Sequence, residues 1–266
     1  MDLRRILERL RRGEIDIDEA ERIIRLWGIE EIENIVKYDI GRHLRRDVPE
    51  IIYGEGKSEE VVLRTVRRVL EHVDRVLISR VEEGHIAKLL SLKRDGYEVK
   101  VNKVARIVVV RRKDAERKHI PCKVGLVTGG TADVKVAEEV RTILEEYGCE
   151  VITLYDVGIA GLHRAIEAVR RLKKEDVDLV IVIAGMEGAL PSIIATLIDV
   201  PVIGVPTSVG YGAGGKGQAA LLSMLQSCPL GVAVVNIDGG VAAAIFALLV
   251  CNRLARRLSR VSKKKT

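Results

Sequence analysis

Glycine-rich stretches with isolated polar side chains are where chemistry could occur in this 266-residue sequence. Glycine lets backbone amides approach a ligand closely, and the amides at a helix N-terminus favour an anion such as phosphate. One such stretch alone would be weak evidence. Five that meet at one sheet edge would predict a site for a phosphate-bearing small molecule, and they span residues 128–133, 156–163, 185–191, 206–216 and 236–240.

Polar side chains inside these stretches supply candidate catalytic and binding groups. Asp133 and His163 stand where helices are predicted to begin, so an ordinary capping role suits them equally well. Glu187 lies between an apolar run and a Gly-Ala-Leu-Pro segment, where a carboxylate is costly to bury unless it is paired or used. The full set of candidates is Asp133, His163, Glu187, Ser208, Lys216 and Asp238.

Cys228 is the candidate nucleophile among the four cysteines, because it sits in a Gln-Ser-Cys-Pro segment between a predicted helix and a predicted strand. Cys122, Cys149 and Cys251 fall in or beside regular elements and are predicted to be packing residues. No CxxC pair occurs, so the sequence signals neither a zinc site nor a disulfide framework. This cysteine usage predicts a reducing, cytoplasmic location.

Two segments resemble a phosphate-binding P-loop without completing the motif. Residues 210–216 supply its first glycines and lysine, but Gly217 stands where a magnesium-binding Ser or Thr is required. Residues 54–58 lack the earlier glycine, and Ser58 is better explained as the cap of a helix. The sequence therefore excludes a P-loop ATPase.

Strands and helices that alternate along the second half of the chain must position these stretches. Strict alternation predicts parallel strands in a flavodoxin-like, doubly wound α/β fold, whose ligand crevice lies outside the carboxyl ends of the strands. Helices are expected to begin near Asp133, His163, Ala189, Gly217 and Gly240. Strands are expected at residues 123–128, 150–155, 178–184, 201–205 and 231–237.

A small α+β domain is predicted to precede this fold. Short helices are expected over residues 2–37 and a clearer amphipathic helix over 58–72. Strand-like runs at 76–79 and 97–111 flank another helix near 82–92. With the charged segment 111–118 as linker, the domains are predicted at residues 1–118 and 119–266.

Composition limits the partners of the chain. A net charge of +6 could indicate nucleic-acid binding, but basic and acidic residues are mixed along the first helices. Only residues 256–265 form a basic run without acids, which reads as a solvated tail, so no nucleic acid is expected. The most apolar stretch, residues 232–250, is interrupted by Asn236 and Asp238, so the chain is predicted to be soluble, without a membrane span.

The glycine-rich stretches resemble the PurE-type superfamily of aminoimidazole ribonucleotide carboxylases and mutases. Two positions depart from its purine enzymes: their catalytic histidine before Leu-Pro is Ala189 here, and their Gln-Met-Pro is Gln-Ser-Cys-Pro ending at Pro229. A purine mutase without its proton-shuttling histidine is not expected to work. The similar motifs lie at residues 129–133, 184–191, 201–206 and 220–226.

Both departures resemble the LarB branch of that superfamily, the pyridinium-3,5-biscarboxylic acid mononucleotide synthases of nickel-pincer nucleotide cofactor biosynthesis. The resemblance covers about residues 120 to 250 and extends more loosely to residues 49–57. Its motifs are Asp-Val-Gly-Ile-Ala-Gly-Leu-His at 156–163, Ala-Gly-Met-Glu-Gly-Ala-Leu-Pro at 184–191, Pro-Thr-Ser-Val-Gly-Tyr-Gly at 206–212, Ser-Cys-Pro at 227–229 and Val-Asn-Ile-Asp-Gly at 235–239.

The resemblance implies a reaction and roles for the residues. Nicotinic acid adenine dinucleotide would be carboxylated by carbon dioxide or bicarbonate and cleaved to the biscarboxylated mononucleotide and AMP. Cys228 would add to the pyridinium ring, Glu187 would move a proton, and His163 is the third catalytic candidate. The implied substrate-binding residues are Gly129, Gly130, Thr131, Asp133, Gly185, Thr207, Ser208, Tyr211, Lys216, Asn236 and Asp238.

The sequence leaves several points open. No cofactor is certain, and whether magnesium assists cleavage of the phosphoanhydride is undecided. Members of this superfamily assemble into oligomers, so the resemblance implies a homo-oligomer, an octamer. Two alternatives remain, a PurE-type aminoimidazole ribonucleotide carboxylase or mutase and a non-catalytic nucleotide-binding protein.

Overall fold

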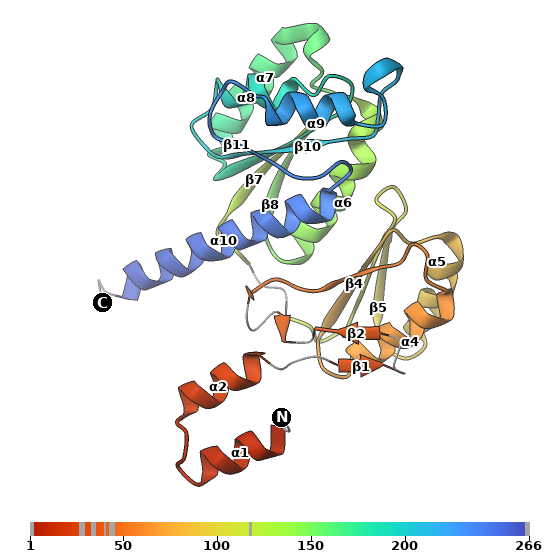
Figure 1. Ribbon diagram of the computed structural model, residues 1–266, viewed down its shortest axis with the longest axis vertical. Coiled ribbons are helices and arrows are strands. Elements are labelled where there is room, and N and C mark those ends of the chain that lie inside the picture. Colours follow the sequence, from red (N-terminus) through yellow and green to blue (C-terminus); the bar gives the residue numbers. More distant parts are fainter. Residues whose placement is uncertain are drawn as a thin grey trace. The chain divides into compact units, whose positions relative to one another are not determined.

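The computed structural model describes residues 3–26, 30–32, 36–39, 41–42, 46–116 and 119–263 (Figure 1). The chain forms two compact units. One comprises Met1–Val101 and Val108–Ala115, and the other comprises Asn102–Ile107 and Glu116–Thr266. No helix in the described ranges is both long enough and apolar enough to cross a membrane.

The first unit contains a four-stranded sheet in the order β3-β4-β6-β5. Its strands are β3 (Ile51–Tyr53), β4 (Arg75–Ser79), β5 (Glu98–Asn102) and β6 (Ile107–Arg111), so the expected run at 97–111 is two strands joined by a turn. Helices α4 (Glu59–Val69) and α5 (Glu83–Leu90) supply apolar residues to the core. The Ser58 side chain accepts a hydrogen bond from the Val61 amide, 3.4 Å away, and caps α4 as expected.

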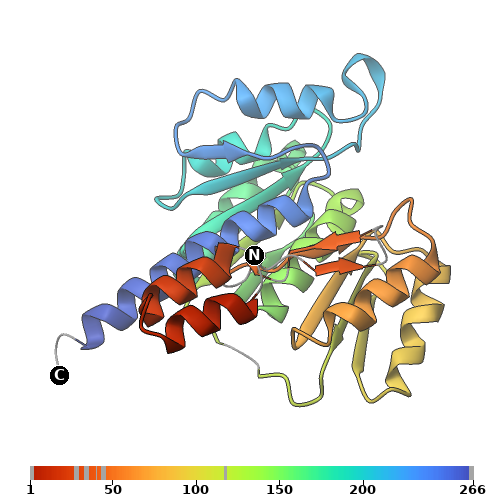
Figure 2. The same ribbon diagram turned by 60° about the horizontal axis from the view of Figure 1, so that its bottom comes forward.

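Helices α1 (Leu3–Arg11) and α2 (Ile17–Leu26) form the helical hairpin at the start of the chain, which Figure 2 shows in red. The expectation of helices as far as residue 37 is wrong, because β1 (Glu30–Ile32) pairs antiparallel with β2 (Val36–Tyr38). Two three-residue strands are too short for helical and strand periodicity to differ in the sequence. Residues 2, 27–29 and 33–35 of that expectation lie outside the described residues.

The second unit is a doubly wound parallel sheet with the order β11-β10-β9-β7-β8, which confirms the flavodoxin-like prediction. The central β7, β9 and β10 are almost entirely buried, as expected for strands covered on both faces. The strands are β7 (Lys123–Thr128), β8 (Glu150–Leu154), β9 (Leu179–Ala184), β10 (Val202–Pro206) and β11 (Val232–Val234).

Helices cover both faces of this sheet. In Figure 1, α6 (Val134–Glu146) and α10 (Gly240–Lys263) lie on one face and pack against each other. The other face carries α7 (Leu162–Glu175), α8 (Leu190–Ala195) and α9 (Gln218–Leu225). Because β7 pairs with both β8 and β9, the order reverses at β7, which is where such folds bind ligands.

Most of the basic run 256–265 belongs to α10, and residues 264–266 lie outside the described residues.

A disulfide joins Cys122, directly before β7, to Cys251 in α10, with their Cα atoms 5.4 Å apart. Both are buried, as expected of packing residues, but the expectation of no disulfide is wrong. The two cysteines are 129 residues apart and belong to no motif, so only the packing of α10 brings them together. Of the other two, Cys149 is buried and Cys228 is exposed.

Candidate active site

A cavity of about 240 Å³ lies at the carboxyl ends of the strands in the second unit. The segments that follow β7, β8, β9 and β10 all contribute to it, which places it at the point where strand order reverses. Its lining consists mainly of backbone and small apolar groups, with two carboxylates. The lining residues are Gly129, Gly130, Ala132, Asp133, Gly158, Ile159, Ala160, Ala184, Gly185, Met186, Glu187, Ala189, Leu190 and Val209.

Asp133 is a buried carboxylate that ties two of these segments together. Its Oδ2 accepts a hydrogen bond from the Gly130 amide at 2.9 Å, and its Oδ1 accepts one from the Thr207 hydroxyl at 2.6 Å. Thr207 is fully buried and does not line the cavity. The Gly129 amide donates to the Ile183 carbonyl at 2.8 Å, so these hydrogen bonds fix the segment after β7 that lines the cavity.

The turn after β9 passes very close to the segment after β10. The Met186 amide donates a hydrogen bond to the Val209 carbonyl at 2.8 Å. A Cβ at Gly185 would lie 2.3 Å from that same carbonyl oxygen, so only glycine fits. This turn holds Glu187 at the cavity with its side chain exposed. The burial cost considered for Glu187 in the sequence therefore does not arise.

Asp238 joins the segments after β10 and β11. Its Oδ1 accepts a hydrogen bond from the Ser208 amide at 3.0 Å, and its own amide donates to the Pro206 carbonyl at 2.8 Å. None of the candidates Ser208, Asp238, Asn236, Tyr211 and Lys216 lines the cavity. Thr131 is exposed and does not line the cavity either.

Cys228 does not line the cavity either. The segment that carries it joins α9 to β11, and Gly231 accepts a hydrogen bond from the amide of Val202, the first residue of β10. Cys228 therefore lies toward the amino ends of the strands, whereas the cavity lies at their carboxyl ends. A 2.6 Å hydrogen bond between the Ser227 and Ser192 hydroxyls holds this segment against α8.

His163 and Arg164 open α7 but differ in position. His163 is exposed and absent from the cavity lining. Arg164 Nη1 donates hydrogen bonds to the Asp156 carbonyl at 3.1 Å and to the Asp156 carboxylate at 3.4 Å. Its Nη2 lies 3.7 Å from where a Cβ of Gly158 would stand, so the guanidinium lies beside the cavity wall. The prediction overlooked this arginine, although a cation in the first turn after a glycine-rich segment is a readable signal for a phosphate.

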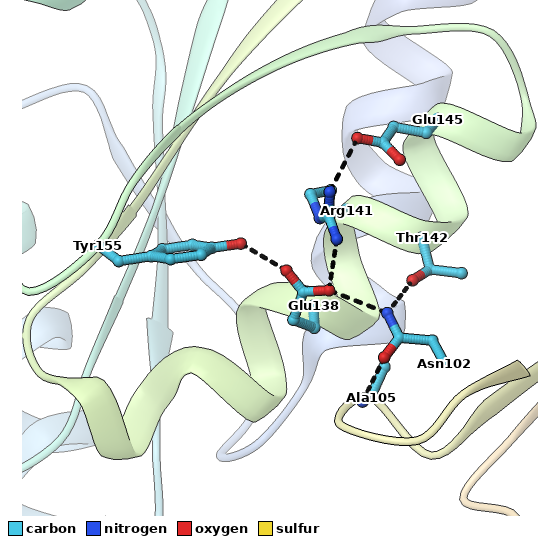
Figure 3. Close-up of polar contacts among 7 residues, drawn as sticks. All are labelled: Asn102, Ala105, Glu138, Arg141, Thr142, Glu145 and Tyr155. Carbon is cyan, nitrogen blue, oxygen red and sulfur yellow. Dashed lines mark hydrogen bonds and ion pairs between the residues drawn. The ribbon is translucent and has the colours of Figure 1, made fainter.

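No sequence pattern predicted the hydrogen-bond network centred on Glu138 of α6 (Figure 3). Glu138 accepts hydrogen bonds from Tyr155 at 2.7 Å, Arg141 at 2.7 Å and Asn102 at 2.9 Å. Burial alone would raise the pKa of Glu138, but these donors outweigh it and hold the pKa below its ordinary value. Burial and the hydrogen bond to Glu138 raise the pKa of Tyr155. The same hydrogen bond fixes the chain at the end of β8, where the cavity-lining segment begins.

No three His, Cys, Asp or Glu side chains in the described part of the chain are arranged to hold a metal ion. Magnesium in phosphoryl chemistry is commonly held by one or two carboxylates together with substrate phosphates. Glu187 and Asp133 are the carboxylates at the cavity, and Asp133 is already engaged by two donors.

Comparisons with known proteins match both units. A family model described as AIR carboxylase matches residues 123–266, and one described as LarB/PurE-like N-terminal domain matches residues 29–113. An uncharacterised protein of Methanocaldococcus jannaschii is 46% identical, covering 94% of this chain and 96% of that protein. The N5-carboxyaminoimidazole ribonucleotide mutase of the same organism is 38% identical over 52% of this chain and 83% of its own length. The crystal structure of Treponema denticola PurE aligns at 20% identity with a TM-score of 0.38, covering 53% of this chain and 92% of that one.

Proposed function

This chain belongs to the AIR carboxylase family, and from that premise we propose that it carboxylates and cleaves nicotinic acid adenine dinucleotide, as the LarB resemblance implies. The products are pyridinium-3,5-biscarboxylic acid mononucleotide and AMP. One combination carries the proposal: the cavity has Ala189 at the position of the purine enzymes' histidine, and the chain has an exposed free thiol at Cys228. None of the described residues lining the cavity is a histidine.

A thiol answers the central difficulty of this reaction, because a pyridinium ring is electron-poor and cannot attack carbon dioxide. The Cys228 thiolate forms a bond to ring carbon 4, and the ring electrons move onto the nitrogen to give a neutral enamine. Carbon 5 of the enamine then attacks carbon dioxide and forms the new C–C bond. Glu187 takes the proton from carbon 5, and the electrons of that C–H bond restore the ring as the C–S bond breaks.

The phosphates of the dinucleotide fit the other features of the cavity. The guanidinium of Arg164 supplies donors and positive charge beside it. Attack of water on the phosphoanhydride breaks the P–O–P bond and releases AMP. Donors that stabilise the charge on the departing phosphate accelerate this step.

The position of Cys228 requires a second copy of the chain in this proposal. Cys228 does not line the cavity of its own copy, so in this proposal its thiol enters the cavity of another copy. Leu222, Leu225 and Leu230 beside it are 61%, 59% and 92% exposed, which supports a contact surface there. The proposed enzyme is therefore a homo-oligomer, and the octamer implied by the resemblance is one such arrangement.

The covalent route is tested by comparing the wild type with Cys228→Ser and with Cys149→Ser as the matched control. An alcohol is almost wholly protonated at neutral pH, so Cys228→Ser should lower incorporation of labelled carbon dioxide by about a thousandfold or more. Its affinity for the dinucleotide should stay close to that of the wild type. Cys149 is buried away from the cavity, so Cys149→Ser should remain active. Undiminished incorporation by Cys228→Ser would remove covalent catalysis from the account.

A second candidate function is the mutase activity for which relatives at 34% to 38% identity are named. Those relatives match about half of this chain, and Ala189 replaces the histidine their reaction needs. Incubation with aminoimidazole ribonucleotide and bicarbonate, or with its N5-carboxylated form, should give no carboxylated purine precursor. Turnover of either compound would favour this second function over the first.

A further inference from the structure

A second cavity, of about 370 Å³, lies in the same unit as the first, and apart from Arg164 its lining residues have no role in the chemistry above. It is formed by the end of β8 and one face of α7. The two cavities adjoin along the chain, because Asp156 and Val157 line the second and Gly158 lines the first.

The first cavity is too small for the whole proposed substrate. Pockets that enclose a drug-sized ligand typically measure about 300 to 1,000 Å³, and a dinucleotide contains two complete mononucleotides. At about 240 Å³ the first cavity can enclose only one of the two halves. The other half must lie outside it, within reach of the phosphoanhydride.

The face of α7 that lines the second cavity carries Arg164, Glu167, Ala168 and Arg171. Spacings of three, four and seven residues align these side chains along one helix face. The separation of seven residues between Arg164 and Arg171 corresponds to about 10 Å along the helix. Arg164 lies at the end beside Gly158, so a phosphate held by Arg164 reaches both cavities.

The remaining groups suit the rest of a nucleotide. Glu167 can accept hydrogen bonds from ribose hydroxyls, and the small side chain of Ala168 leaves room for a flat base. The Arg171 guanidinium can stack on that base, and it makes no hydrogen bond or ion pair with any described residue.

The strand opposite α7 offers hydrogen-bonding groups to the base. Strand β8 is an edge strand of the sheet, so its backbone groups that do not pair with β7 are open to a ligand. Thr153, Leu154 and Tyr155 line the cavity along this edge. The hydrogen bond of Tyr155 to Glu138 fixes the end of this edge (Figure 3).

We propose that the second cavity binds the adenylate half of the dinucleotide, a nucleoside 5′-phosphate, and holds AMP after cleavage. The inference rests on the proposed function for the identity of the dinucleotide. It assigns the phosphate to Arg164, the ribose to Glu167 and the base to Ala168, Arg171 and the edge of β8.

Calorimetric titration of the full-length protein with AMP, without bicarbonate, tests this assignment. Wild type should bind AMP, and Arg171→Ala should bind it at least tenfold more weakly. Arg170→Ala is the matched control, since Arg170 is the adjacent exposed arginine of α7 and does not line the cavity. Titration with nicotinic acid mononucleotide should give the same affinity in wild type and Arg171→Ala, because that half occupies the first cavity.

The outcomes separate the inference from the proposed function. Arg171-dependent AMP binding by a protein that does not carboxylate the dinucleotide would support the nucleotide site and overturn the proposed reaction. Carboxylation by a protein whose AMP affinity is the same in wild type and Arg171→Ala would overturn the assignment of the second cavity. Equal losses in Arg170→Ala and Arg171→Ala would also overturn it, because they would mark a general effect of helix charge.

Discussion

The two free cysteines differ sharply in what their thiols can do. Cys228 is exposed on the segment after α9, whereas Cys149 is 5% exposed directly before β8. Burial raises the pKa of Cys149 to about 12, so it holds almost no thiolate at neutral pH. A thiol nucleophile in this chain must therefore be Cys228.

This contrast predicts selective alkylation of the folded protein. Iodoacetamide at pH 8 should modify Cys228 and leave Cys149 intact, as followed by intact mass and peptide mapping. In denaturant, both should react. Modification of Cys149 at the rate of Cys228 in the folded protein would contradict the assigned difference.

Glu138 predicts a pH-dependent contribution to stability. Its pKa is lower in the folded protein than its ordinary value of 4.5, so the stability it provides is present above that value and is lost as pH falls through the folded pKa. Glu138→Gln should lower the free energy of unfolding by about 1 to 3 kcal/mol at pH 7. The difference from wild type should shrink below pH 4.5.

Guanidinium unfolding at pH 7 and below pH 4.5 measures this effect, with Glu145→Gln as the control. Glu145 is exposed and lies 3.5 Å from Arg141, so its loss should cost less than about 1 kcal/mol. A cost for Glu138→Gln that does not change with pH would show that its charge does not stabilise the fold.

At the scale of elements, the alternation of apolar runs and helices was sufficient to predict the second unit. Strand β7 has the predicted bounds, and α10 begins at Gly240 as expected. Contacts between distant segments were not predictable, because nothing local encodes them. The buried bond between Thr207 and Asp133 and the pairing of Cys122 depend on tertiary packing. Sequence position indicated Cys228 as a nucleophile but not that it lies away from the cavity of its own copy.

The Cys122–Cys251 disulfide predicts that the second unit is sensitive to reductant. Closing a loop across 129 residues stabilises a fold by up to about 5 kcal/mol in the chain-entropy model. Dithiothreitol should lower the Tm of the wild type and leave the Tm of Cys251→Ser unchanged. Carboxylation at moderate temperature should persist in reductant, since Cys228 is not in the disulfide. A wild-type Tm that is the same with and without dithiothreitol would contradict a stabilising role for the disulfide.

At the scale of the whole molecule, the account depends on an active site shared between copies. The cavity residues and Cys228 lie toward opposite ends of one sheet, and exposed leucines surround the cysteine. A stable monomer with full activity would be incompatible with this arrangement.

Mixing two inactive variants tests the shared site. Oligomers reassembled from equal amounts of Cys228→Ser and Glu187→Gln chains should regain activity, because some sites then combine an intact cysteine with an intact glutamate. Random mixing should restore roughly a quarter of the wild-type rate. Each variant taken alone through the same treatment should stay inactive, and a mixture as inactive as its components would place both groups in one copy.

The most direct measurement of the proposed function is mass spectrometry of the products from nicotinic acid adenine dinucleotide and ¹³C-labelled bicarbonate. The account predicts AMP together with a pyridinium mononucleotide that carries two carboxyl groups, one of them labelled. Unchanged dinucleotide, or AMP released with an uncarboxylated mononucleotide, would contradict it.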